Sequence, residues 1–174
     1  MAVEIEDELK DRILKIQNEL KFEKMKIVKP QNLHVTLKFL GEIDEEKTEK
    51  VLEVLRDTSK EFSPFKASLK KLGVFRNLNY IRVLWIGIDN EMEELQKRID
   101  EKLSLLGFKR EKKIIPHLTL ARVKYLKDKK AFLEKFRELE NVEVGEVEVK
   151  SVKLKKSILT SKGPIYSDVE EVLL

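Results

Sequence analysis

Apolar residues recur at helical spacing in two long segments of the chain. The first segment begins near Asp7 and the second near Asn90. Each places hydrophobic side chains about every three to four residues, which is the spacing of one buried helix face. Gly107 follows the second segment, and a glycine at such a point can adopt the left-handed conformation that often ends a helix. We predict two amphipathic helices, the second closed by Gly107.

Two further and highly charged segments, 44–60 and 128–139, show the same periodicity. Each begins with an aspartate, Asp44 or Asp128. The carboxylate of an aspartate in this position accepts a hydrogen bond from a free backbone N–H group of the first helical turn. We therefore predict a helix in each segment, with the aspartate as its N-cap.

Other segments alternate apolar and polar residues, which is the pattern of half-buried strands. Residues 65–75 and 80–88 form the first pair of such segments. Residues 145–159 and 164–174 form the second pair. We predict one strand in each of the four.

The order of these elements repeats along the chain. An offset of 83 residues maps the first half onto the second, with the order strand, helix, strand, helix, strand, strand. Such duplications give similar lobes related by a pseudo-twofold axis. We predict an α+β fold in which two antiparallel sheets flank a central cleft and helices cover the outer faces. Residues 1–174 are expected to form a single domain of two intertwined lobes.

The repeat is incomplete at the start of the chain. A full predicted strand, residues 80–88, precedes the helix near Asn90, whereas only residues 1–6 precede the helix near Asp7. The first strand is therefore expected to be shorter than symmetry alone would predict.

Composition narrows the functional classes. Hydrophobic residues make up 41% and charged residues 39% of the chain, which allows a core beneath a heavily charged surface. The net charge of +4 permits a polyanionic partner without requiring one. The absence of cysteine excludes disulfides and thiolate chemistry. No apolar run approaches the length of a membrane span, and no signal-peptide pattern opens the chain. We expect a soluble cytoplasmic protein.

The two histidines of the chain stand in the same frame, His-x-Thr-Leu. His34 lies in NLHVTLKFLG and His117 in IPHLTLARV, and both stretches have the alternation of a strand. Side chains two residues apart in a strand share a face. His34 therefore shares a face with Thr36, and His117 shares one with Thr119. A pseudo-twofold axis would bring both imidazoles and both hydroxyls into one cleft.

This set of groups suits acid–base chemistry at phosphorus. A neutral imidazole can take a proton from an attacking oxygen while an imidazolium protonates the leaving oxygen. Threonine hydroxyls can donate to the non-bridging oxygens as charge builds there, and the scheme needs no metal. Zinc binding would need further ligands, and a threonine nucleophile would lack its usual surrounding motif. Histidines satisfied within the core remain the structural alternative.

The paired motifs resemble the 2H phosphoesterase superfamily. Within it, the chain resembles the archaeal and bacterial RNA 2′,3′-cyclic phosphodiesterases, which are also called 2′-5′ RNA ligases. The segments that carry the resemblance are residues 33–43, 116–124, 154–169 and 73–88. The resemblance implies a bilobal fold with a central cleft. It also implies metal-independent and ATP-independent opening of an RNA 2′,3′-cyclic phosphate to a 2′-phosphate, or 2′-5′ ligation when an RNA 5′-hydroxyl replaces water.

The resemblance further implies roles for individual residues. His34 matches the proton donor to the leaving 3′ oxygen. His117 matches the proton acceptor that activates water. Thr36 and Thr119 would hold the phosphate oxygens. No cofactor and no metal are implied.

Three more residues are candidates for substrate binding. Arg122 lies where the family tends to carry an arginine, and a guanidinium binds phosphate through two donors. Alternation turns it away from His117 unless a bulge intervenes. Lys38 has the parity of His34 and is a candidate for the cleft wall. Tyr166 can stack on a nucleobase or pack on a helix, and we favour packing on a helix.

The expected partners are RNA ends, on tRNA-like or other oligoribonucleotides, with no membrane association and a monomeric state. The basic segments 108–113 and 153–162 can follow an RNA backbone, although such runs are more often solvated faces. Three alternatives stay open. The substrate can be a small cyclic nucleotide such as ADP-ribose 1″,2″-cyclic phosphate. The protein can be a non-catalytic RNA-binding module. It can also be a purely structural duplication with both histidines on the core side of their strands.

Overall fold

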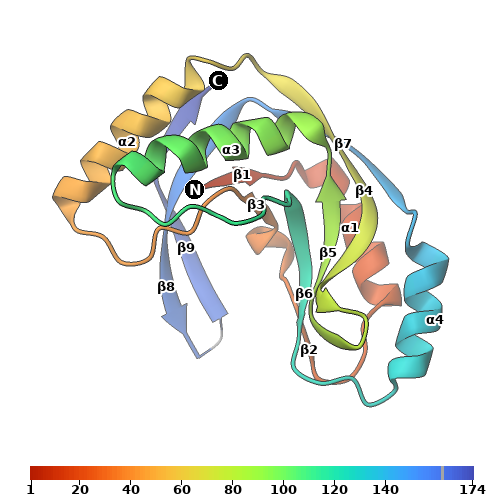
Figure 1. Ribbon diagram of the computed structural model, residues 1–174. Helices are drawn as coiled ribbons and strands as arrows, with labels where there is room; N and C mark the ends of the chain where they lie inside the picture. Colours follow the sequence, from red (N-terminus) through yellow and green to blue (C-terminus); the bar gives the residue numbers. More distant parts are fainter. Residues whose placement is uncertain (162) are drawn as a thin grey trace.

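The computed structural model describes residues 1–161 and 163–174, and in them four helices lie against an antiparallel sheet (Figure 1). The helices are α1 (Asp7–Glu19), α2 (Glu45–Ser59), α3 (Asn90–Leu105) and α4 (Lys129–Leu139). The strands are β1 (Ala2–Glu4), β2 (Met25–Ile27), β3 (His34–Thr36), β4 (Phe65–Asn77), β5 (Tyr80–Ile88), β6 (His117–Val123), β7 (Glu143–Val149), β8 (Ser151–Thr160) and β9 (Gly163–Leu173). The predicted α+β class is confirmed. No helix in the described residues is long and apolar enough to cross a membrane.

The helix ends lie where the sequence places them. The Asp44 and Asp128 carboxylates each accept a hydrogen bond from the backbone N–H three residues further on, at 2.8 and 2.9 Å. Gly107 has a φ of 84° and its N–H donates to the carbonyl of Ser104. These contacts satisfy backbone groups that would otherwise be unpaired at the helix termini. The predicted caps are confirmed.

The strands form one hydrogen-bonded path in the order β7-β4-β5-β6-β3-β1-β8-β9, and β2 pairs with β6. One half of this path contains β7, β4, β5 and β6, and the other contains β3, β1, β8 and β9. The halves are joined where β3 meets β6, at the register pair Val35 and Leu118. The two predicted sheets are therefore continuous through a single short junction.

Residues 145–159, predicted as one strand, form parts of two strands in different halves of the sheet. β7 pairs with β4, whereas β8 pairs with β1 and β9. The buried positions change parity between them, from Val147 and Val149 in β7 to Val152 and Leu154 in β8. A regular strand without a bulge keeps one parity. Because the pairing partners change together with the parity, the chain crosses here from one half of the sheet to the other.

The two halves exchange elements. The first strand, β1, has three residues where its repeat counterpart β5 has nine, so the predicted short strand is confirmed. It pairs with β3 and β8, but the helix that follows it, α1, packs on β6 and β7 of the other half. Helices α2 and α3 pack against each other (Figure 1). Fully buried side chains on the three helices include Ile13 of α1, Leu55 of α2, and Met92, Leu95 and Ile99 of α3.

Lys38 lies in the interior and does not line the expected cleft. Strand β3 ends at Thr36, and Leu37 and Lys38 are both buried. The Lys38 ammonium donates to the Asp100 carboxylate at 2.5 Å and to the Lys109 carbonyl at 2.6 Å. The side chains of this ion pair are 3% and 1% exposed. Alternation ends with the strand, so parity placed Lys38 wrongly. Its ion pair ties the segment after β3 to α3.

Replacing Lys38 by alanine would remove the buried cationic partner of the Asp100 carboxylate and leave it only Arg110, a largely exposed side chain whose Nε lies 3.5 Å away. We expect the free energy of unfolding to fall by about 3–5 kcal/mol, the range for removing one member of a buried ion pair. Urea unfolding followed by circular dichroism measures the change. The control is Lys50→Ala, which removes an exposed pair with Glu46 and should cost far less. Equal losses in the two variants would contradict the prediction.

Candidate active site

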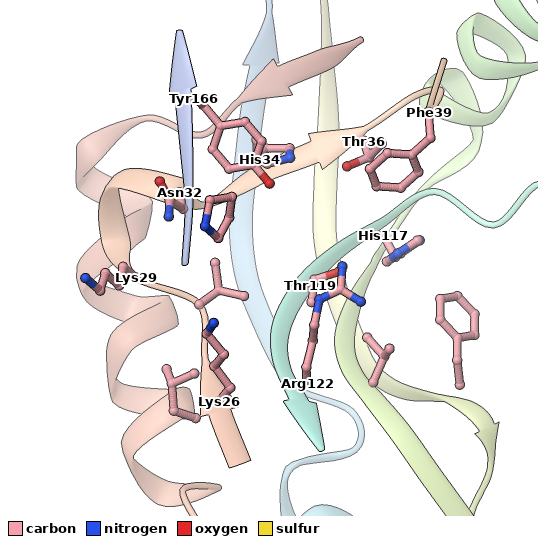
Figure 2. A pocket seen from close by; sticks show the side chains of 15 residues that line it. Lys26, Lys29, Asn32, His34, Thr36, Phe39, His117, Thr119, Arg122 and Tyr166 are labelled. Carbon is pink, nitrogen blue, oxygen red and sulfur yellow. The ribbon is translucent and has the colours of Figure 1, made fainter. Parts of the chain in front are cut away.

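Both histidines line the same pocket, which has a volume of about 380 Å³ (Figure 2). His34 and Thr36 reach it from β3, and His117 and Thr119 reach it from β6. Val35, between His34 and Thr36, and Leu118, between His117 and Thr119, are fully buried on the opposite face of the sheet, as strand alternation requires. Because both imidazoles face a cleft, the alternative in which they lie on the core side of their strands is wrong.

A β-bulge brings Arg122 to the same pocket. Thr119 pairs with Trp85 of β5, and Ala121 pairs with the preceding residue of that strand, so Leu120 is an extra residue in β6. Leu120 and Ala121 are both buried, and Arg122 returns to the cleft face. A bulge re-aims the side chains that follow it. The bulge therefore reverses the parity that would have turned Arg122 away.

The pocket is positively charged. Its described lining includes the cationic side chains of Lys26, Lys29 and Arg122 and no carboxylate. Lys26 lies directly across from Arg122 in the pairing of β2 with β6. Cations gathered in a concave site without an acidic partner favour an anionic ligand.

His117 is held by the backbone of its own strand and by aromatic rings. Its Nδ1 lies 2.7 Å from the Ile115 carbonyl oxygen. A carbonyl only accepts hydrogen bonds, so this contact assigns the proton to Nδ1 and leaves the Nε2 lone pair free to accept a proton. The Phe75 ring meets the imidazole edge to face at 4.8 Å, and the Trp85 ring lies 6.0 Å away.

Tyr166 lies against His34 and not on a helix. The two rings meet edge to face, with centroids 5.1 Å apart, and both side chains line the pocket (Figure 2). The interpretation that this tyrosine packs on a helix is therefore wrong. Tyr166 lies in β9, opposite Ser157 of β8, and β9 also contributes Pro164 to the pocket lining.

Burial lowers the pKa of both imidazoles below the ordinary value of 6.5. For His34, a hydrogen bond to the Asn32 backbone opposes this change and the charge of Lys155 adds to it. For His117, the Arg122 charge lowers the pKa further. Both histidines are therefore neutral at neutral pH in the free protein. A bound anion would favour their protonated forms.

Several lining residues have no clear signal in the sequence. Phe39 is 73% exposed and lies beyond Thr36 on the side of His117 (Figure 2). Alternation would have placed it in the core, but the strand ends before it. Asn32 and Lys29 belong to the short turn and loop before β3, which have no periodicity to indicate their direction.

Among the residues that the structure describes, no three histidine, aspartate or glutamate side chains come together as a metal site would require. The site is thus defined by two imidazoles, two hydroxyls and three cations.

Known proteins resemble this chain in fold and in sequence. The chain matches the model of the LigT like phosphoesterase family twice, over residues 3–85 and 86–166. It is 46% identical to the RNA 2′,3′-cyclic phosphodiesterase of Methanocaldococcus jannaschii over 98% of this chain and 97% of that protein. It is 42% identical to the protein of that name from Methanothermobacter thermautotrophicus over 98% and 95%. The crystal structure of TT0787 from Thermus thermophilus matches with a TM-score of 0.85 at 30% identity, over 99% and 95% of the two chains.

The chain belongs to the LigT-like phosphoesterase family. The two matches to the family model divide the chain where the internal repeat divides it. The resemblance inferred from the paired histidine motifs is therefore confirmed over nearly the whole chain.

Replacing Gly73 by alanine should disturb the wall behind His117. A Cβ at Gly73 would lie 2.1 Å from the Trp85 ring, so that ring must move. We expect a loss of about 1–3 kcal/mol in stability, the usual cost of overpacking, and a change in the fluorescence of Trp85, the single tryptophan of the chain. The double variant Gly73→Ala/Trp85→Phe relieves the overlap and should recover stability. Unchanged fluorescence in Gly73→Ala would contradict the prediction.

Proposed function

We propose that the protein hydrolyses RNA 2′,3′-cyclic phosphate ends to 2′-phosphates by a metal-independent mechanism that uses two histidines. The observation that supports this most strongly is the pairing of both imidazoles, each with its threonine hydroxyl, in one positively charged pocket. The names of the relatives that are more than 40% identical support the substrate.

In the proposed reaction, His117 is the base. Its Nε2 takes a proton from water, and the water oxygen forms a bond to phosphorus while the bond from phosphorus to the 3′ oxygen breaks. His34, in its protonated form, gives its proton to that 3′ oxygen. The product carries a 2′-phosphate and a 3′-hydroxyl. Solvent then returns the proton from His117 to His34, and the cycle can repeat.

The remaining polar side chains of the pocket stabilise the charge that develops. The hydroxyls of Thr36 and Thr119 donate to the non-bridging phosphate oxygens, and Arg122 offers two further donors to the same group. Phe39 and Tyr166 lie on opposite sides of the pocket and offer faces on which a nucleobase stacks. With an RNA 5′-hydroxyl in place of water, the same groups would form a 2′-5′ linkage.

The direct test uses an oligoribonucleotide that ends in a 2′,3′-cyclic phosphate, incubated with purified protein and a metal chelator. We expect a 2′-phosphate product. His34→Ala and His117→Ala should each lower kcat/KM by at least ~10²-fold, because each removes one proton transfer. Added imidazole should partly restore the activity of these variants, which a merely structural role would not allow. No 2′-phosphate from the unaltered protein would overturn the proposal.

The pH dependence of kcat/KM provides an independent check. The reaction needs one neutral and one protonated histidine, and burial places both pKa values below 6.5. The product of the two fractions is greatest between the two pKa values, so the maximum should lie below pH 6.5 and the rate should fall as pH rises beyond it. Arg122→Gln removes a charge that lowers the pKa of His117 and should move the pH of the maximum rate to a higher value. A rate that still rises above neutral pH would exclude this pair of roles.

A further inference from the structure

The tip of the β4–β5 hairpin carries an exposed aromatic ring between two arginines. Tyr80 is 50% exposed. The guanidinium of Arg82 lies 4.7 Å from the centre of its ring, and that of Arg76 lies 5.7 Å from it. Cations at these distances interact with the face of the ring. Arg82 also donates to the Lys124 carbonyl at 3.3 Å, which links the tip to the end of β6.

These arginines differ from many other surface cations in their partners. In residues 1–161 and 163–174, neither Arg76 nor Arg82 has a carboxylate within ion-pair distance. Basic side chains elsewhere often do. In the basic segment 153–162, for example, Lys153 and Lys155 both contact the carboxylates of Glu4 and Asp168, and Lys162 lies outside the described residues. The charge at the hairpin tip is therefore available to an external anion.

The tip begins where the pocket ends. Phe75 and Val83 line the pocket, and Arg76 and Arg82 are the next residues along each strand. Val83 pairs with Arg122 of β6. The backbones of paired strands lie about 5 Å apart, so Arg122 in the pocket is close to the base of the hairpin tip. The hairpin lies beside β6 and the loop that follows it (Figure 1). The register of β4 with β5 moves from the pair Phe75 and Val83 to the pair Arg76 and Ile81, so Arg82 is an extra residue that strand alternation does not turn away from the side of Val83. Positive charge thus continues from the pocket to the tip through Arg82.

We infer that the hairpin tip binds the single-stranded RNA chain whose cyclic phosphate end occupies the pocket. Arg76 and Arg82 contact its phosphates, and its bases stack on Tyr80 or on the guanidinium planes. This inference rests on the proposed function. A mononucleotide fills the pocket without reaching the tip, so the tip makes a longer RNA the preferred substrate.

The test compares cytidine 2′,3′-cyclic phosphate with a longer single-stranded oligoribonucleotide that ends in the same group. We expect Arg76→Gln/Arg82→Gln to lower kcat/KM for the oligonucleotide by on the order of tenfold, with the mononucleotide rate unchanged. The dependence of the oligonucleotide rate on salt should also weaken, by a slope of about 0.7 for each phosphate that the tip no longer binds. Tyr80→Ala should lower the oligonucleotide rate with little change in that slope.

A charge-matched control separates local binding from net charge. Lys50→Gln/Lys60→Gln removes the same charge from α2 and its C-cap and should leave both rates unchanged. Thermal unfolding of each variant verifies that the fold is retained. An unaltered oligonucleotide rate in the arginine variant, or an equal loss on both substrates, would overturn the inference. Failure of the unaltered protein on both substrates would instead overturn the proposed function.

Discussion

The site depends on one junction, the pairing of β3 with β6 at Val35 and Leu118. Both residues are fully buried, and the residues on either side of each point to the opposite face. That face therefore receives one histidine and one threonine from each strand. A shift of register by one residue would turn one of these sets into the core. The apolar burial of two residues thus fixes the positions of four polar side chains on the opposite face.

The sequence predicts a residue's position wherever a local rule has an energetic cause. His34 and Thr36 could be placed together because burying Val35 forces the alternation. The helix N-caps could be placed because a free backbone N–H needs an acceptor. Lys38 and Phe39 could not be placed, because β3 ends at Thr36 and alternation ends with it. The direction of such residues depends on what the rest of the fold offers them, and for Lys38 that is a buried carboxylate from α3.

Two irregularities show the same limit in a different way. The extra residue Leu120 reverses the parity of Arg122, and the change of parity after Val149 divides a predicted strand in two. Both changes are visible in the apolar pattern, but only once the register of neighbouring strands is known. A bulge and a crossing between sheets produce similar breaks in alternation. The three-dimensional pairing distinguishes them, since a bulged strand keeps its neighbour and a crossing strand acquires a new one.

The distribution of paired and unpaired cations separates stability from binding. The net charge of +4 does not indicate where an anion would bind, because many charged side chains on the surface form ion pairs with one another. In the pocket, Lys26 and Arg122 are paired across two neighbouring strands, and the described lining contains no acidic side chain. Like charges on neighbouring strands repel each other. This arrangement is unfavourable in the free protein, and a bound phosphate would relieve the repulsion. In the proposed reaction, the phosphate of the substrate would also raise the pKa of both histidines, which burial has lowered, and would so favour the protonated imidazole that donates the proton.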